Sequence, residues 1–240
     1  MKKNILILGA SSDIGVELIK LLLKNEFNIT AHCFTNSSAL SRISKKNKKL
    51  LIVQKDLNKL NDKNIKNFCK KNFNNEFGAY VNLIGYIDNK SFKNTSIDSF
   101  LKSISVNALI PMLILRYILK KMLINKYGRI LNGSSIGVKF GGGENSFNYS
   151  VSKHILEFIP SIIKKSANKN IVMNNLRIGV TNTKIHSRLK RNKININKRI
   201  SHIPSKRMAS KIEIAEYIYF LISEKNSFMT NETITVAGGE

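Results

Sequence analysis

The sequence predicts an α/β fold in which a parallel sheet is covered by helices on both faces. Short, almost wholly apolar segments alternate along the chain with longer amphipathic segments. Strands that are apolar on both sides are typical of a buried parallel sheet, and the alternation with helices is typical of this class. The 240 residues contain no repeat, low-complexity linker or Pro/Gly-rich boundary. We therefore expect one doubly wound domain that spans residues 1–240 and has a full core.

Strands are expected where a short apolar run is bounded by polar residues or glycine. Seven such runs occur, at Asn4–Leu8, Asn28–Phe34, Leu50–Gln54, Gly78–Leu83, Gly128–Asn132, Ile171–Ile178 and Thr233–Val236. Their composition predicts that most of them are buried in the middle of the sheet.

Helices are expected where apolar residues recur at helical spacing. Five segments show this pattern, at Ile14–Lys24, Ile65–Phe73, Ile97–Ile124, Tyr149–Ala167 and Ile212–Ser223. Pro160 predicts a kink in the fourth helix, because proline removes a hydrogen bond from the helix interior. Thr183–Ser210 is polar and aperiodic, and we interpret it as a loop or lid.

The composition points to a chain that works in a reducing compartment without a membrane. The longest apolar stretch, Leu109–Ile124, contains Arg116, Lys120 and Lys121, so we expect it not to span a bilayer. Cys33 and Cys69 have neither metal-ligand nor disulfide spacing. We expect a cytoplasmic protein with no metal site.

The net charge of +25 has two interpretations. A polyanionic partner, such as nucleic acid or an acidic substrate, would be attracted by it. The basic residues are nevertheless spread along a chain rich in Lys, Asn and Ile, and no nucleic-acid-binding motif accompanies them. A general compositional bias is therefore the favoured interpretation, and we expect no nucleic-acid partner.

The first strand ends in a glycine-containing turn, Gly9-Ala10-Ser11-Ser12-Asp13-Ile14-Gly15, that opens the first helix. Glycines at such a turn let the backbone approach a pyrophosphate, and the helix N-terminus offers free N–H groups and a positive dipole end. The turn predicts a dinucleotide phosphate site. Asp13 has the alternative role of a helix N-cap.

The residues after the second strand favour NADP over NAD. An acidic residue near this point would hold the ribose 2′-OH of NAD, and the sequence there is Thr35-Asn36-Ser37. Asn36, Ser37 and Arg42 could accept a 2′-phosphate, although an ordinary polar turn is the alternative. Asp56, after the third strand, could bind the adenine amino group or cap a turn.

Tyr149 and Lys153 lie four residues apart, which places both side chains on one face of a helix. An ammonium beside a phenol lowers the phenol pKa from its reference value of about 10. The spacing therefore suggests an acid–base pair. A solvated surface pair is the alternative when the spacing is considered alone.

Several motifs in order resemble the short-chain dehydrogenase/reductase family, and the 3-oxoacyl-ACP reductases within it. The resemblance runs from about residue 3 to Glu240, and it is carried by Gly9–Gly15, Val81-Asn82-Leu83-Ile84-Gly85, Ser105-Val106-Asn107, Arg129–Ser135, Tyr149 with Lys153, Gly179–Thr183 and Ala237-Gly238-Gly239. Leu8, Asp13, Leu83-Ile84 and Ile178 depart from the family pattern. Ser135 is preferred to Ser134 as the family's catalytic serine because of its spacing from Asn132 and Tyr149.

The resemblance implies a Rossmann-type fold and an NAD(P)H-dependent interconversion of a ketone and a secondary alcohol. It implies that Tyr149 donates the proton, with its pKa lowered by Lys153 and by the positive charge of the oxidised cofactor, and that Ser135 polarises the carbonyl. It also implies that Lys153 holds the nicotinamide ribose and that Asn107 positions a water that relays protons to Lys153. The implied cofactor contacts are Gly9, Ser11, Ser12, Asp13, Ile14, Gly15, Thr35, Asn36, Ser37, Asp56, Leu57, Asn82, Gly85, Tyr149, Lys153, Gly179, Val180 and Thr183.

The segment that closes over the substrate in this family is basic here and suggests an anionic substrate. It contains Lys184, Arg188, Lys190, Arg191, Lys193, Lys198, Arg199, Lys206 and Arg207, and no acid. A 3-oxoacyl thioester fits, with Arg129 where the 3-oxoacyl-ACP reductases contact a carrier protein. A sugar or nucleotide-sugar substrate, a non-enzymatic nucleotide-sensing or RNA-binding regulator, and a solvated loop remain alternatives. The resemblance also implies a homotetramer or homodimer.

Overall fold

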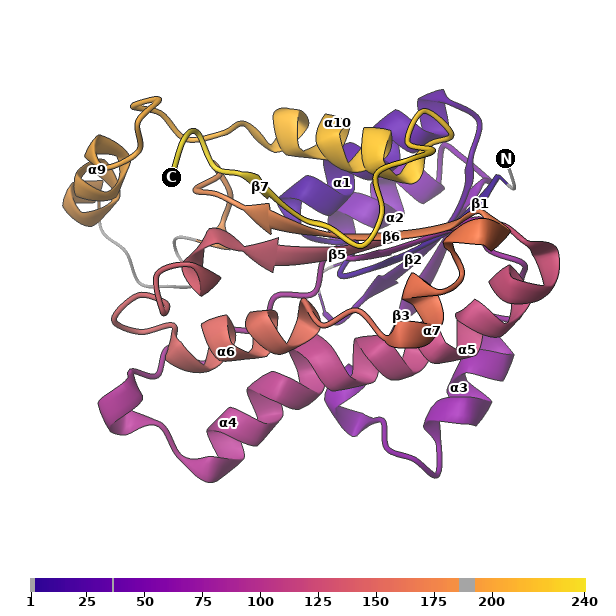
Figure 1. The fold of residues 1–240 in the computed structure, drawn as a ribbon, viewed down its shortest axis with the longest axis horizontal. Coiled ribbons are helices and arrows are strands. Elements are labelled where there is room, and N and C mark those ends of the chain that lie inside the picture. Colours follow the sequence, from indigo (N-terminus) through magenta and orange to yellow (C-terminus); the bar gives the residue numbers. More distant parts are fainter. Residues whose placement is uncertain (1–2, 36, 186–192) are drawn as a thin grey trace.

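A single sheet of seven parallel strands runs through the computed structural model, which describes residues 3–35, 37–185 and 193–240 (Figure 1). The strand order is β3-β2-β1-β4-β5-β6-β7. The strands span Asn4–Leu8 (β1), Asn28–Cys33 (β2), Leu50–Gln54 (β3), Ala79–Asn82 (β4), Gly128–Ser135 (β5), Ile171–Ile178 (β6) and Thr233–Val236 (β7). The predicted fold class and all seven strands are confirmed, and β5 runs three residues beyond its predicted end.

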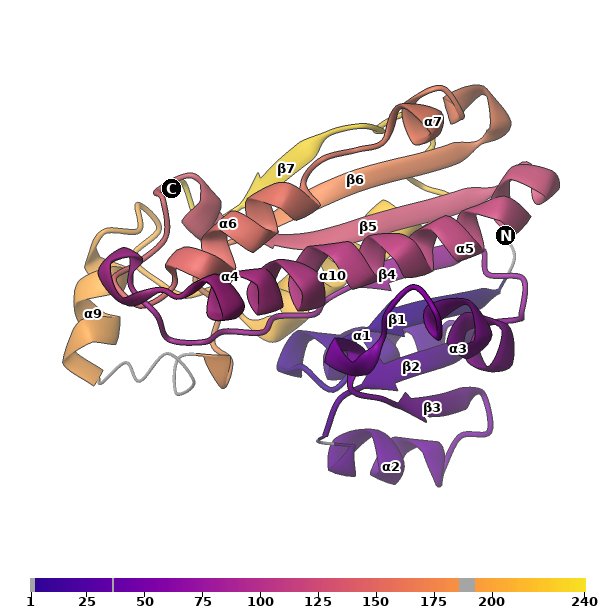
Figure 2. The ribbon, with the colours of Figure 1, turned by 90° about the horizontal axis from the view of Figure 1, so that it is seen from below.

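Helices cover both faces of the sheet (Figure 1). One face carries α1 (Asp13–Lys24) and α10 (Lys211–Ile222), which pack on each other, and α2 (Ser38–Ser44) lies beside β3 (Figure 2). The other face carries α3 (Ile65–Asn72), α4 (Ile97–Ile104), α5 (Ile110–Asn125) and α6 (Phe147–Leu156), followed by the short α7 (Ser161–Lys164). Near the carboxyl ends of the strands lies α9 (Lys193–Ser201).

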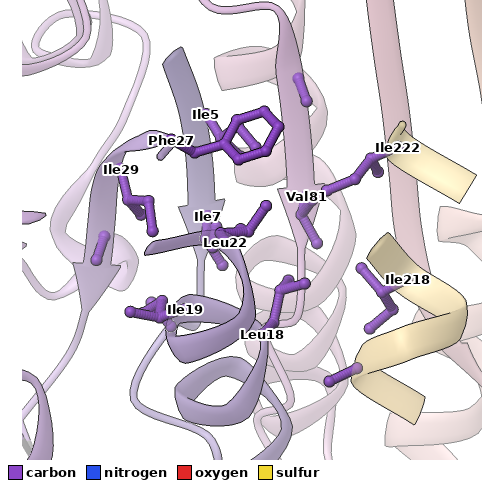
Figure 3. Packing of buried hydrophobic residues seen from close by; sticks show 14 of the residues in the cluster. Ile5, Ile7, Leu18, Ile19, Leu22, Phe27, Ile29, Val81, Ile218 and Ile222 are labelled. Carbon is purple, nitrogen blue, oxygen red and sulfur yellow. The ribbon is translucent and has the colours of Figure 1, made fainter. Parts of the chain in front are cut away.

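The alternation of side chains along each strand divides the core into two clusters. Ile5 and Ile7 of β1 point to the α1 and α10 side, where Figure 3 shows Ile5 beside Phe27 and Ile7 beside Leu22 of α1. Leu6 and Leu8 belong to the cluster on the opposite face, with α3 and α5. β1 is thus apolar on both faces because both faces are buried, which is the feature that its sequence predicted.

The helix that carries Tyr149 is shorter than predicted. The pattern predicted one kinked helix over Tyr149–Ala167, whereas α6 ends at Leu156 and α7 begins after Pro160. The residue before a proline is disfavoured in helical conformation, so Pro160 separates two helices here. Two helices, α2 and α9, were not predicted, and α9 lies inside the segment interpreted as an aperiodic loop.

The predicted long helix at Ile97–Ile124 is continuous with a π-helical turn inside it. Ser105–Leu109 forms this turn between α4 and α5. The whole stretch, Ile97–Asn125, is by length and composition sufficient to cross a membrane, which was not expected from the sequence. In the structure 33% of its apolar window is buried. The buried part includes Ile114 and Ile118 of α5, which belong to the core beside β1.

Candidate active site

A cavity of about 970 Å³ opens at the carboxyl ends of the strands. β1 lies between β2 and β4, so the order of the strands along the sheet reverses beside it. Ligands of open α/β sheets bind at such a switch point, because the chain leaves the neighbouring strands in opposite directions there. The glycine turn after β1, the end of β5 and the start of α6 all line the cavity. No cluster that could hold a metal ion occurs among the described residues.

The glycine turn is built for close backbone approach. Gly9 has a φ of +70°, and a Cβ atom there would lie 2.7 Å from the Ile84 nitrogen. A Cβ on Gly15 would lie 2.6 Å from the Ala10 oxygen. Ser12 is the N-cap of α1, because its Oγ accepts a hydrogen bond from the Gly15 N–H at 3.1 Å. Ser12, Asp13 and Ile14 at the start of α1 line the cavity, and this cradle at the helix N-terminus fits a dinucleotide diphosphate.

Asp13 has a different role from the N-cap that the sequence allowed. It lies in the first turn of α1, and its Oδ2 accepts a hydrogen bond from the Lys184 N–H at 2.7 Å. The carboxylate therefore connects the glycine turn to the start of the basic segment, and both residues line the cavity.

The expected contacts after β2 and β3 are only partly in place. Ser38, Ala39 and Arg42 line the cavity, whereas Thr35 and Ser37 are not among its lining residues, and Asn36 lies outside the described residues. The guanidinium of Arg42 is thus a described cation on this side of the cavity. Lys20 and Lys211 also line the cavity, and both pair with Glu17.

Asp56 and Leu57 are also away from the cavity lining. Asp56 caps a short turn, where its carboxylate accepts a hydrogen bond from the Asn58 N–H at 3.0 Å, and Leu57 is buried in the core. The capping alternative for Asp56 therefore describes its contacts.

Asn82 and Gly85 lie where the chain leaves β4. Asn82 is fully buried, and its Oδ1 accepts a hydrogen bond from the Ile84 N–H at 3.1 Å. Its amide nitrogen has no partner among the described residues. Gly85 lies against Tyr149, since a Cβ there would lie 3.9 Å from the Tyr149 ring. Asn82 shapes the turn, while Gly85 lines the cavity beside the phenol.

Lys153 is a buried lining residue of the cavity, and its amino group is bonded to the backbone. Its side chain is 2% exposed, and Nζ donates hydrogen bonds of 2.6 Å to the carbonyls of Ile84 and Gly133. Burial lowers the pKa of Lys153 to about 7, because the charged form is poorly solvated, while the charge of Glu157 opposes this shift. Nζ lies 5.7 Å from the centroid of the Tyr149 ring.

Tyr149 is held in its protonated form. Burial raises its pKa to about 12, and a hydrogen bond with Ser135 acts in the opposite direction. The prediction that Lys153 lowers the phenol pKa is wrong for the protein alone, because desolvation is the larger effect. A neutral phenol is nevertheless the form that can give up a proton to a developing alkoxide.

The two adjacent serines at the end of β5 have different environments. Ser134 donates a hydrogen bond to Glu157 Oε1 at 2.6 Å, so its hydroxyl is occupied. Ser135 lowers the pKa of Tyr149 against the larger effect of burial, and its Oγ accepts a hydrogen bond from the Gly137 N–H at 3.1 Å. Ser135 rather than Ser134 thus interacts with the phenol, and its choice as the catalytic serine stays a prediction.

Asn107 lies in the π-helical turn and is fully buried. Its side chain accepts a hydrogen bond from the Tyr86 N–H at 2.7 Å and donates to the Tyr86 carbonyl and to Ser152 Oγ, both at 2.9 Å. These bonds fasten the segment after β4 to α6. The side chain is thus committed to the scaffold around Lys153.

The segment after β6 forms the opposite wall. Gly179, Val180 and Thr183 line the cavity as expected. The Gly179 N–H donates to the Val236 carbonyl at 2.9 Å, and a Cβ on Gly179 would lie 2.5 Å from the Ala237 Cα. The glycine is therefore required where this wall meets the end of β7.

The basic residues are less available than the sequence suggested. Arg129 is 2% exposed, donates to Asn170 at 2.9 Å and stacks on Tyr127, so its predicted contact with a carrier protein is wrong. Arg207 pairs with Glu213 at 2.7 Å. Of the remaining members of the segment, Arg188, Lys190 and Arg191 lie outside the described residues.

The far wall of the cavity contains Phe140, His202 and Glu240, which no sequence motif identified. Arg199 of the predicted basic segment lines the same wall. Arg199 forms an ion pair with Glu240 and lies over the Phe140 ring at 6.0 Å from its centroid. The signal for these residues was weak, because they come from three separate segments that only the fold brings together.

Comparisons with known proteins agree with this geometry. The profile of a family described as enoyl-(acyl carrier protein) reductase, of the short-chain dehydrogenase type, matches residues 9–240. The chain is 32% identical to the 3-oxoacyl-[acyl-carrier-protein] reductase FabG of Buchnera aphidicola subsp. Schizaphis graminum, over 99% of this chain and 97% of the relative. It is 32% identical to the acetoacetyl-CoA reductase of an Acinetobacter species, over 66% of this chain and 63% of the relative.

Two solved structures show the same fold. The 3-oxoacyl (acyl-carrier-protein) reductase of Agrobacterium tumefaciens with NADP bound superposes with a TM-score of 0.86 at 20% identity, covering 99% of this chain and 94% of that one. A 4-hydroxyisoleucine dehydrogenase mutant complexed with NADH and succinate superposes with a TM-score of 0.83 at 27% identity, covering 99% and 98%.

Proposed function

The chain belongs to the short-chain dehydrogenase/reductase family of NAD(P)-dependent oxidoreductases, and from this premise we propose that it uses NADPH to reduce a 3-oxoacyl thioester. The observation that carries the proposal is the convergence of Ser135, Tyr149 and Lys153 on one cavity that also contains the glycine cradle. Its relatives at 32% identity are named reductases of 3-oxoacyl and acetoacetyl thioesters. We set aside the non-enzymatic regulator.

The mechanism assigns one task to each group. The bound nicotinamide would supply the hydride. Ser135 donates a hydrogen bond to the carbonyl oxygen, where negative charge develops, and Tyr149 gives its phenolic proton to the same oxygen. The ammonium of Lys153 holds the ribose hydroxyls and stabilises the phenolate that remains. Asn107 keeps α6 in register with the segment after β4, and it connects through Ser152 to the helix that holds Lys153.

The choice of NADPH depends on the residues that follow β2. Arg42 lines the cavity near the end of this strand, and no acidic residue is present between Phe34 and Arg42. A guanidinium stabilises a 2′-phosphate, while a carboxylate would be needed for the 2′-OH of NAD. Relatives of the fold bind both cofactors, since one structure contains NADP and another NADH.

We propose that the described parts of the basic segment, residues 183–185 and 193–210, border the entrance for the substrate and attract an anionic one. Lys184 and Arg199 of this segment line the cavity. We also propose that the chain assembles as a homodimer or homotetramer through the exposed apolar side chains of α4 and of the segment after α6, among them Ile97, Leu101 and Phe158.

A sugar or nucleotide sugar is the second candidate, and one observation favours it. Glu240 Oε2 is buried without a hydrogen-bond partner among the described residues, and the Glu240 side chain is 4% exposed. A carboxylate oxygen in such a position is satisfied by a hydroxyl donor of a ligand. Phe140, 54% exposed on the same wall, offers a flat apolar surface to a sugar ring.

The test measures NADPH and NADH binding by fluorescence and then oxidation of NADPH with an acetoacetyl thioester and with keto sugars. Tyr149→Phe removes the proposed proton donor, and Tyr217→Phe, on the exposed side of α10, is the matched control. Thioester turnover that is lost only in Tyr149→Phe supports the proposal. Turnover of keto sugars alone supports the second candidate, and binding of neither nucleotide contradicts both.

A further inference from the structure

The helix that carries the proposed acid–base pair ends early. α6 contains ten residues and stops at Leu156, one turn after Lys153. The last carbonyl groups of a helix lack partners within the helix, so an end this close to Lys153 has to be stabilised by other means. Pro160 prevents the helix from continuing to provide them.

Side chains from two strands bind the carbonyls at the end of α6. Asn132 of β5 donates to the Leu156 carbonyl at 3.2 Å, and Asn175 of β6 donates to the Glu157 carbonyl at 2.7 Å. The two amides also contact each other, at 3.3 Å. The end of the helix is therefore fixed to the sheet below it by buried polar groups.

The Glu157 carboxylate extends this network to the end of β5. Arg177 of β6 binds both carboxylate oxygens, at 2.7 and 2.6 Å, and Ser134 donates to Oε1 at 2.6 Å. The Glu157 side chain is 7% exposed and the Arg177 side chain 25%. Bidentate pairs of this kind hold both partners in one geometry. Ser134 is adjacent to Ser135, and Glu157 lies one helical turn beyond Lys153.

We propose that Glu157 is a positioning residue for the reduction: through Arg177 and Ser134 it fixes the end of α6 against β5 and so sets where Lys153 and Ser135 lie. The inference rests on the proposed function, because it assigns Lys153 and Ser135 to the reaction. Neither the glycine cradle nor the cavity wall contains Glu157, so its effect reaches the reaction through other residues.

The charges around the network support this role. Burial raises the pKa of Glu157, but the hydrogen bonds from Arg177 and Ser134 outweigh it and hold the pKa below its usual value. His154 on α6 lies 3.7 Å from Oε2 on the exposed side. The negative charge of Glu157 raises the pKa of Lys153 against the larger effect of burial. Lys153 otherwise faces Tyr149, the β5 carbonyl of Gly133 and the carbonyl of Ile84.

The experiment compares Glu157→Gln with Glu216→Gln, which removes the same charge from the exposed face of α10. We expect Glu157→Gln to lower the Lys153 pKa and move the high-pH limb of kcat to lower pH. At a pH above both limbs, kcat of the variant should be lower than that of the wild type by about tenfold for each pH unit by which the limb moves. NADPH binding near neutral pH should change less than kcat. Glu216→Gln should leave both unchanged.

Arg177→Gln separates the charge of Glu157 from the clamp that Glu157 forms with Arg177. It breaks the same ion pair but leaves the Glu157 charge in place, so the proposal predicts a lower kcat in this variant as well, with a high-pH limb that does not move to lower pH. A purely structural role predicts that both variants lose thermal stability and activity together with no difference in the pH limb. Equal limbs in the two folded variants, or wild-type kcat in Glu157→Gln, would overturn the proposal.

A readout without turnover keeps the inference separate from the proposed function. The pH dependence of the unfolding midpoint, measured without cofactor, follows Lys153 through proton linkage. If the wild type reduces no ketone, the proposed function fails. A change in the pH dependence of the unfolding midpoint in Glu157→Gln, and not in Glu216→Gln, would still support the coupling of Glu157 to Lys153. If Glu157→Gln does not fold, Ser134→Ala replaces it, and unchanged kcat in that variant overturns the proposal.

Discussion

Replacing Lys153 by methionine should change the pH dependence of folding stability in a direction that the burial of Lys153 determines. The folded protein holds this group at a pKa of about 7, against an ordinary lysine pKa of 10.5. Between these values the unfolded chain binds more protons than the folded one, so the free energy of unfolding of the wild type rises with pH. Methionine has no proton to bind, so this rise is absent in the variant.

The magnitude follows from linkage. Each pH unit between the two pKa values changes the wild-type free energy of unfolding by about 1.4 kcal/mol relative to the variant. From about pH 7 to about pH 9.5 the free energy of unfolding of the wild type should therefore rise by roughly 3 kcal/mol relative to that of Lys153→Met. The variant also loses the hydrogen bonds to Ile84 and Gly133, but this loss is nearly independent of pH and shifts both ends of the comparison equally.

Urea unfolding of both proteins, followed by circular dichroism at several pH values without cofactor, provides the measurement. All other titrating groups are shared, so they cancel in the difference between the two proteins. A constant difference across this range would refute the reasoning, because it would mean that Lys153 titrates alike in the folded and unfolded chain. At neutral pH and below, the buried ammonium destabilises the folded wild type most. The free energy of unfolding of the variant should therefore be most favourable relative to the wild type there, although the variant should be inactive.

Three further substitutions test other parts of the site. Gly9→Ala should lower the free energy of unfolding by about 2 kcal/mol or more and should remove most of the NADPH affinity. The control is Gly141→Ala, because Gly141 has the same φ of +70° but nothing within 4 Å of the added Cβ. Arg42→Gln should weaken NADPH binding about tenfold in a fluorescence titration and leave NADH binding unchanged; equal effects on both would contradict the NADPH assignment. Ser135→Ala should lower kcat about 100-fold or more with NADPH binding retained, and a smaller loss than in Ser134→Ala would reverse the assignment of the two serines.

The sequence predicts the sheet well because each strand is defined by a local run of apolar residues. Ile171–Ile178 and Thr233–Val236 were predicted to the residue. Most helix ends were predicted to within one residue, but the end of the helix that carries Tyr149 was wrong, because it depends on contacts that are distant in sequence. α6 ends where Asn132 and Asn175 bind its carbonyls, and no local pattern shows that these strands lie beneath it.

The residues of the candidate site also fall into those that the sequence predicted and those that it missed. Its motif residues, such as Tyr149 and Lys153, were recognised because each motif occupies consecutive or helically spaced positions. Glu157 and Glu240 were missed, since their partners come from other strands and segments. The direction of the Tyr149 pKa shift was also wrong, because charge proximity can be seen in a sequence while the degree of burial cannot.

The place of β1 in the strand order affects how the chain acquires its structure during synthesis. β1 gains its first neighbour when β2 emerges, with Asn4 opposite Asn28, but its other edge waits for β4, where Ile5 pairs with Ala79. At typical ribosomal rates of roughly 5–20 residues per second, that edge stays open for several seconds. An unpaired apolar strand is a template for wrong pairing. β1, an inner strand of the finished sheet, is therefore a vulnerable part of the nascent chain.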